Sequence, residues 1–136
     1  MTEGTDLSGR GNGVVGTINH RLNVLGFTYL GDVAGGDFAQ SGDVGMLDIV
    51  QALRWVRNNI AQFGGDAGNV TVFGQSGGHR KVGTLLVTPP AKGLFHLAFT
   101  ESGPSMTLAE RVQANRGACD LRSMLGLNKS LVRYRQ

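Results

Sequence analysis

One serine of the sequence lies between glycines at a spacing that acyl-transfer chemistry uses. Residues 74–78 read GQSGG, so Ser76 has a glycine two positions before it and another two positions after it. In such a G-x-S-x-G turn, a sharp strand-to-helix bend lifts the serine hydroxyl clear of a sheet, and the helix directs its first amides at a developing oxyanion. Glycines at the outer positions remove side chains that would collide in so tight a turn. The motif predicts Ser76 as a nucleophile and Gly74 and Gly78 as the glycines of its elbow.

The setting of this motif is more specific than its spacing. With 22 glycines and seven serines in 136 residues, the spacing alone arises easily by chance. An elbow also requires a strand before the serine and a helix after it. The β-branched run VTVF precedes the motif, and the segment GGHRKVGTLLV follows it as a predicted helix that stops before Pro89 and Pro90. This order favours a nucleophile over a polar residue caught among glycines.

Strand-like and helix-like segments alternate along the chain. Consecutive apolar residues in 14–20 are typical of a strand covered on both faces, as in a parallel sheet. The further segments are strands at 70–73 and 96–101 and helices at 43–63, 77–87 and 106–125. Strand and helix in turn predict an α/β fold with a mainly parallel sheet, right-handed crossovers and helices on both faces.

The helix expected at 43–63 has the clearest pattern. Leu47, Val50 and Leu53 recur at three-residue steps and make one face apolar. Asp43 suits the positive end of the helix dipole, and Gly64 with its glycine neighbour can close the other end by adopting positive φ. Residues 22–42, between the first strand and this helix, are expected to form a long, partly packed connection.

Bulk properties exclude several classes of protein. The length suits one domain, and no apolar run approaches the roughly 20 residues of a membrane span. The N-terminus lacks the basic start and apolar segment of a signal peptide, so nothing in it directs export. A single cysteine, Cys119, allows no internal disulfide or metal-ligand cluster, and we expect it to be a small core residue. The formal charge of +3 is scattered except at 79–81 and 128–136, which predicts a solvated basic surface rather than a nucleic-acid site.

Three stretches together resemble a known family. GTINHRLNVLGF, GDVGMLDIVQALRWVRNNIAQFGGDAGNVTVFGQSGG and PAKGLFHLAFTESG are similar, in order and spacing, to the type-B carboxylesterases of the α/β-hydrolase fold. The resemblance covers about residues 14–103 and continues more weakly to 127. It implies hydrolysis of small-molecule carboxylic esters through an acyl-enzyme, without metal or organic cofactor.

The resemblance also assigns roles to individual residues. Ser76 matches the family's nucleophile, and the backbone N–H of Gly77, where the family usually has alanine, matches one oxyanion-hole donor. Arg21 and Asp48 match a buried structural ion pair, and Ser102 matches a serine that supports the acidic residue of the triad. These roles are what the resemblance implies, because spacing alone does not distinguish them.

The rest of the family's machinery is not found among these residues. In α/β hydrolases an acid and then a histidine follow the serine, but the last histidine here, His96, precedes Glu101, Glu110 and Asp120. No H-G-G-G oxyanion loop precedes residue 14. We expect His79 to point away from the elbow, and His96, like His20, to be structural.

These gaps lead to one main hypothesis and two alternatives. We expect residues 14–136 to be part of a larger carboxylesterase domain, after a loose lead-in at 1–13, with very low activity alone and with sheet edges that promote self-association. The alternative is a non-catalytic, hydrolase-like binding module. A nucleotide site at GRGNG, residues 9–13, is disfavoured, because phosphate-binding glycines follow a strand and these precede one.

Overall fold

The computed structural model describes residues 4–102 and 109–127. Contacts divide the chain into one unit formed by residues 1–19 and 48–106 and another formed by 20–47 and 107–136. We describe each unit by itself. The helices are α1 (Thr5–Gly11), α2 (Asn23–Phe27), α3 (Gly31–Ala34), α4 (Val44–Asn59), α5 (Gly77–Leu86) and α6 (Arg111–Met124), and the strands are β1 (Thr71–Gln75) and β2 (Leu97–Glu101).

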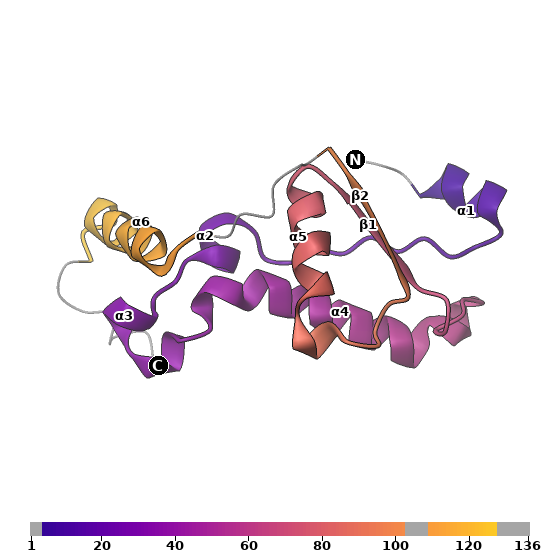
Figure 1. The fold of residues 1–136 in the computed structure, drawn as a ribbon, viewed down its shortest axis with the longest axis horizontal. Coiled ribbons are helices and arrows are strands. Elements are labelled where there is room, and N and C mark those ends of the chain that lie inside the picture. Colours follow the sequence, from indigo (N-terminus) through magenta and orange to yellow (C-terminus); the bar gives the residue numbers. More distant parts are fainter. Residues whose placement is uncertain (1–3, 103–108, 128–136) are drawn as a thin grey trace. The chain divides into compact units, whose positions relative to one another are not determined.

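The first unit is built on a parallel pair of strands. In β1 and β2, Phe73 pairs with Phe99 and Gln75 with Glu101, so the two strands end side by side (Figure 1). Helix α5 follows β1 directly and contacts both strands. The strands expected at 70–73 and 96–101 and the helix at 77–87 are therefore confirmed, with α5 as the crossover between parallel neighbours.

The strand expected at residues 14–20 is wrong. The structure assigns this segment no regular secondary structure, and Val14 and Ile18 are 45% and 46% exposed rather than covered on both faces. A strand exists only where a neighbouring strand accepts and donates its backbone hydrogen bonds, and β1 and β2 pair only with each other among the described residues. Apolar, β-branched composition without such a neighbour does not produce a strand.

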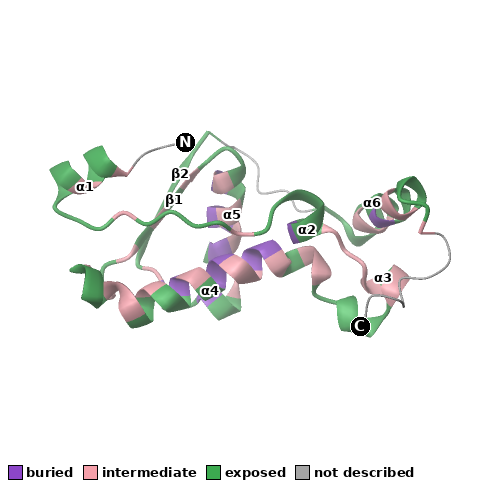
Figure 2. Ribbon diagram, turned by 180° about the vertical axis from the view of Figure 1, so that it is seen from behind, coloured by how far each residue is buried: buried purple, intermediate pink, exposed green. Residues whose placement is uncertain are grey.

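Helix α4 confirms the periodic pattern that predicted it. It covers Val44–Asn59 and continues as a 3-10 turn over Ile60–Phe63. Val50 and Leu53 are buried, as expected, and Figure 2 shows buried residues on both α4 and α5. Gly64 ends the turn in the left-handed conformation, with φ +79°, and its N–H donates to Ala61 O at 3.1 Å. Glycine closes this end because it adopts positive φ without steric cost.

Several short helices occupy segments that were expected to be irregular. Residues 5–11 form α1 where the composition predicted a loose lead-in, and the connection 22–42 contains α2, α3 and two 3-10 turns. The last expected helix is confirmed as α6. Its Cys119 is exposed rather than buried, because its neighbour Ala118 occupies the buried face of the helix. No described helix is long and apolar enough to cross a membrane.

The exposed face of the β1–β2 pair predicts self-association. Gly74 faces α5, so Phe73, one residue earlier on β1, points to the opposite face, where it is 53% exposed beside Phe99 at 57%. We expect Phe73→Lys to shift the chain from oligomer to monomer in sedimentation velocity, because a charge on this face opposes apolar and edge-to-edge pairing. Leu7→Lys, at a similarly exposed apolar residue of α1, is the control and should leave association unchanged. A monomeric wild-type chain at micromolar concentration contradicts this expectation.

Candidate functional site

The turn between β1 and α5 brings two backbone segments into close approach at Gly74. A Cβ added to Gly74 would lie 2.6 Å from the carbonyl carbon of Gly78, closer than real Cβ atoms come to such an atom. The first turn of α5 thus lies directly against the end of β1. Only glycine leaves room for this bend, so the structure supplies the physical reason for Gly74 in the motif.

Ser76 stands at the corner of this turn in a strained conformation. Its φ of 56° and ψ of −112° lie outside the regions that residues with a side chain ordinarily adopt. Its backbone N–H donates to Glu101 O at 3.1 Å, so the end of β2 holds the corner in place. A strained, exposed corner between strand and helix is what a nucleophile elbow requires, and the role of Ser76 as nucleophile stays a prediction.

The hydroxyl of Ser76 is not used to cap α5. Ser76 is the N-cap residue of α5, a position at which serine commonly accepts a hydrogen bond from an amide of the first turn. The structure shows no side-chain capping bond there. A purely structural explanation for the serine, as a helix cap, therefore finds no support in its geometry.

Gly77 and Gly78 begin α5, whose first amides have no partner within the helix. The role of the Gly77 N–H as an oxyanion donor stays a prediction, although its place directly after Ser76 meets the requirement. Lys81 lies over the same turn, with Nζ 3.5 Å from Gly77 O. For Gly78, the steric reason given by the sequence is wrong, because a Cβ there meets no described atom within 4 Å.

The histidines near the site are not placed as bases. His79 is 8% exposed on the buried side of α5, and neither ring nitrogen has a hydrogen-bond partner among the described residues, so it makes no hydrogen bond to the Ser76 hydroxyl. His96 accepts a hydrogen bond at Nδ1 from Val70 N at 3.1 Å, which confirms a structural role just before β2. Despite the HRK sequence in its first turns, α5 packs against both strands.

The remaining predicted residues lie at several places in the described chain. Ser102 directly follows β2 with φ 58°. Arg21 precedes α2, and its carbonyl oxygen would lie 2.7 Å from a Cβ added to Gly45, so its backbone is closely packed. Asp48 belongs to α4. The ion pair of Arg21 with Asp48 and the supporting role of Ser102 stay predictions.

One partner of the elbow was missed by the sequence analysis. The Glu101 carbonyl holds the Ser76 N–H, but nothing in the residue type of Glu101 predicts a role for its backbone. The strand register decides this role, because Gln75 pairs with Glu101 and Ser76 is the next residue of the chain. The signal available was the pair of expected strands, since parallel neighbours end at the same edge of a sheet.

Other features of the described residues do not add to this site. No group of three or more histidine, cysteine, aspartate or glutamate side chains among them is placed to hold a metal ion. A hollow of about 430 Å³ is lined by residues of 85–95. It lies at the C-terminal end of α5, roughly 15 Å along the helix from Ser76, so it is separate from the elbow.

The two elbow glycines should respond differently to alanine. Gly74→Ala pushes a methyl group into the backbone of Gly78 and should lower the free energy of unfolding by about 1–3 kcal/mol or more. Gly78→Ala is the matched control. It meets open space within a helix and should raise stability by up to about 1 kcal/mol. Urea unfolding followed by circular dichroism measures both, and equal effects contradict the steric account.

Replacing His79 should stabilise the protein. Its two buried nitrogens have no hydrogen-bond partner within residues 4–102 and 109–127, so His79→Leu removes their desolvation penalty and should raise the free energy of unfolding by roughly 1–3 kcal/mol. His96→Leu, in contrast, loses the bond to Val70 N and should lower it by about 0.5–1 kcal/mol. Thermal and urea unfolding of the two variants decide the matter, and a destabilised His79→Leu protein overturns the prediction.

Comparison with known proteins shows the family and the fold class of the chain. The sequence profile of the carboxylesterase family matches residues 1–129. The para-nitrobenzyl esterase of Bacillus subtilis is 43% identical over 129 residues, which are 95% of this chain and 26% of that protein. Mouse carboxylesterase 1D is 49% identical over 107 residues, which are 79% of this chain and 18% of that protein. A crystal structure of a Geobacillus stearothermophilus carboxylesterase superposes with a TM-score of 0.87 at 46% identity, covering 91% of this chain and 26% of that one, which confirms the α/β-hydrolase fold class. The chain thus spans about a quarter of the length of its bacterial relatives, and it belongs to the carboxylesterase family.

Proposed function

We propose that this chain carries the nucleophile of a carboxylesterase and that Ser76 is that nucleophile. The observation that supports this most directly is the strained, exposed serine at the β1–α5 corner, whose hydroxyl makes no capping bond. In the proposed reaction, Ser76 Oγ attacks the ester carbonyl and loses its proton to a base, and the alcohol then leaves to give an acyl-enzyme. Water releases the carboxylic acid in a second step.

The oxyanion of this reaction would form beside the first turn of α5. Gly77 directly follows Ser76, and its amide has no partner within the helix. Partial positive charge at a helix N-terminus favours an anion there, and removal of one such donor typically costs about 10²–10³ in kcat. We therefore assign Gly77 N–H as one donor of the oxyanion hole.

The expected rate of ester hydrolysis by these 136 residues alone depends on whether a base can take the proton of the Ser76 hydroxyl. None of the three histidines is a base for Ser76 in this account: His79 makes no hydrogen bond to its hydroxyl, His96 accepts from Val70 N, and His20 precedes the serine. Loss of a triad histidine costs up to about 10⁶ in kcat, so the 136 residues by themselves should hydrolyse esters very slowly. Small-molecule esters are the proposed substrates.

A hybrid enzyme tests Ser76 with a complete set of partners. Residues 1–129 replace their counterparts in the Bacillus subtilis para-nitrobenzyl esterase, which matches this chain over 129 residues. Hydrolysis of 4-nitrophenyl acetate by the hybrid should fall by about 10⁴-fold or more with Ser76→Ala. Ser123→Ala, at an exposed serine of α6, is the control and should leave the rate unchanged.

Two further measurements make this test decisive. The isolated chain is assayed with the same ester, and its rate should be far below that of the hybrid. Circular dichroism shows whether each variant is folded. A folded, active hybrid whose rate is the same with Ser76→Ala overturns the assignment of the nucleophile.

A further inference from the structure

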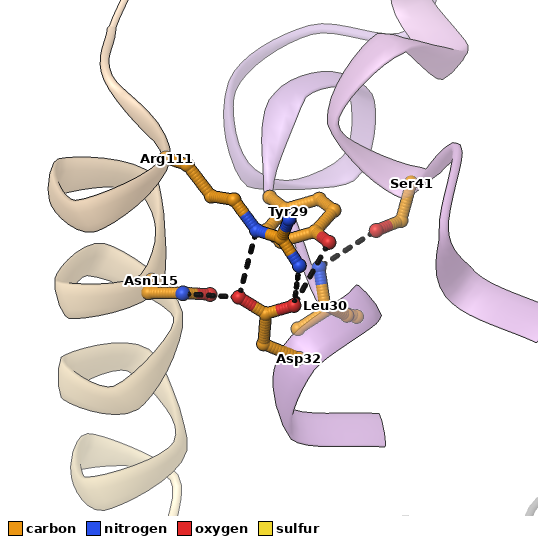
Figure 3. Close-up of polar contacts among 6 residues, drawn as sticks. All are labelled: Tyr29, Leu30, Asp32, Ser41, Arg111 and Asn115. Carbon is orange, nitrogen blue, oxygen red and sulfur yellow. Dashed lines mark hydrogen bonds and ion pairs between the residues drawn. The ribbon is translucent and has the colours of Figure 1, made fainter. Parts of the chain in front are cut away.

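The carboxylate of Asp32 gathers hydrogen-bond donors from three other side chains, far from the elbow in sequence (Figure 3). Arg111 Nε donates to Oδ2 at 3.0 Å, and Arg111 Nη2 donates to Oδ1. Asn115 Nδ2 also donates to Oδ2, and the Tyr29 hydroxyl donates to Oδ1 at 3.1 Å. Both oxygens of one carboxylate are thus held by two donors each.

The geometry of the donors is specific for a planar carboxylate. Arg111 presents two parallel N–H groups to the two oxygens, the bidentate arrangement that a lysine cannot reproduce. Asn115 lies four residues later on α6, so both side chains project from the same face of that helix. The guanidinium carbon of Arg111 also lies over the Tyr29 ring, 5.7 Å from its centre, so the ring adds a cation–π interaction to the hydrogen bonds.

The backbone that carries Asp32 is itself held in place. Leu30 N donates to Ser41 Oγ at 2.7 Å, which ties the start of α3 to a residue eleven positions later (Figure 3). Asp32 then lies in the single turn of α3, with 31% of its side chain exposed. Hydrogen bonds from the Arg111 guanidinium, and to a smaller extent from the Asn115 amide, hold the pKa of the Asp32 carboxyl well below its ordinary value. This carboxyl group therefore stays ionised.

Apolar packing contributes little to the attachment of α6. Ala118 is the one buried residue of this helix, whereas Val112 is 62% exposed and Met124 is 85% exposed. Within the second unit, α6 contacts α3, the helix that carries Asp32. The polar cluster therefore supplies the specific interaction between these two helices.

We propose that Tyr29, Arg111 and Asn115 form a carboxylate-binding cradle, which Asp32 occupies as an internal ligand and through which α6 is fastened to α3. The ligand class is a carboxylate, because the donors form a planar, two-oxygen pattern. Removal of the internal carboxylate leaves a site that a small free carboxylate enters, and α6 is released when the cradle is empty. This inference does not depend on the role of Ser76.

The chain offers its own probe of this attachment. Cys119 is the single cysteine, is exposed, and lies on α6 beside Ala118, so a nitroxide label there reports the mobility of α6 by electron paramagnetic resonance. In the full chain, Asp32→Ala should make the label several-fold more mobile. Addition of about 0.3 M sodium acetate should restore the immobile spectrum, because the free carboxylate presents the same two oxygens to the donors as the internal ligand does. The same concentration of sodium chloride should not.

Three variants separate the cradle from general effects of charge or folding. Arg111→Gln should also release α6, but acetate should not restore it, because the bidentate donor is lost. Arg111→Lys retains the charge and should nevertheless show a mobile label. Asp120→Ala, at an exposed acid of α6, should behave like the wild type.

Each of these outcomes bears on the proposal. An immobile label in Asp32→Ala, or a mobile label that acetate and chloride affect equally, overturns the carboxylate cradle. Restoration of Arg111→Gln by acetate also overturns it. Restoration of Asp32→Ala by acetate alone, without restoration of Arg111→Gln, supports it.

Discussion

The close approach of the first turn of α5 to the end of β1 is the constraint on which the site depends. Gly74 lies so close to the backbone of Gly78 that a side chain on Gly74 would clash with it. This contact forms the sharp corner that Ser76 occupies. The hydrogen bond from Ser76 N to Glu101 O then ties the corner to β2. The strained conformation of Ser76 is maintained because the close contact of Gly74 with Gly78 fixes the turn around it and its own N–H is bonded to β2.

This constraint also depends on the parallel pairing of the two strands. Parallel strands end at the same edge of a sheet, so β2 delivers a carbonyl oxygen to the turn that follows β1. The same pair leaves Phe73 and Phe99 exposed on the face away from α5. The strands therefore hold the backbone of Ser76 at one end and present two exposed phenylalanines on one face.

The second unit is held by a different kind of interaction. There a carboxylate and its donors, rather than a buried apolar face, connect α3 with α6. Hydrogen bonds to charged groups are directional, and they require each donor to be placed to within a fraction of an ångström of the ideal distance. The two units thus show two ways to fix a side chain: by steric exclusion at the elbow and by convergent donors at Asp32.

Local pattern accounts for the three longest helices and for both strands, and its one failure among the expected strands has a clear cause. The periodicity of α4, the β-branched run of β1 and the prolines after α5 each depend on neighbours in sequence, and the structure confirms all three. Residues 14–20 have the composition of a strand but no described partner to pair with. Cys119 is likewise exposed rather than buried, because a rotation of about 100° per residue along α6 turns Ala118, and not Cys119, inward.

From the amino-acid sequence alone, the strand–turn–helix setting of Ser76, the longer helices and the family to which the chain is similar could all be predicted. These properties are local, or depend on motifs in a fixed order. The folded chain was needed to show that Gly74 is sterically required whereas Gly78 is not, that Glu101 holds the corner through its backbone, and that Asp32 meets Arg111. Residues that are distant in sequence meet only in the folded chain, and backbone atoms carry no signature of residue type.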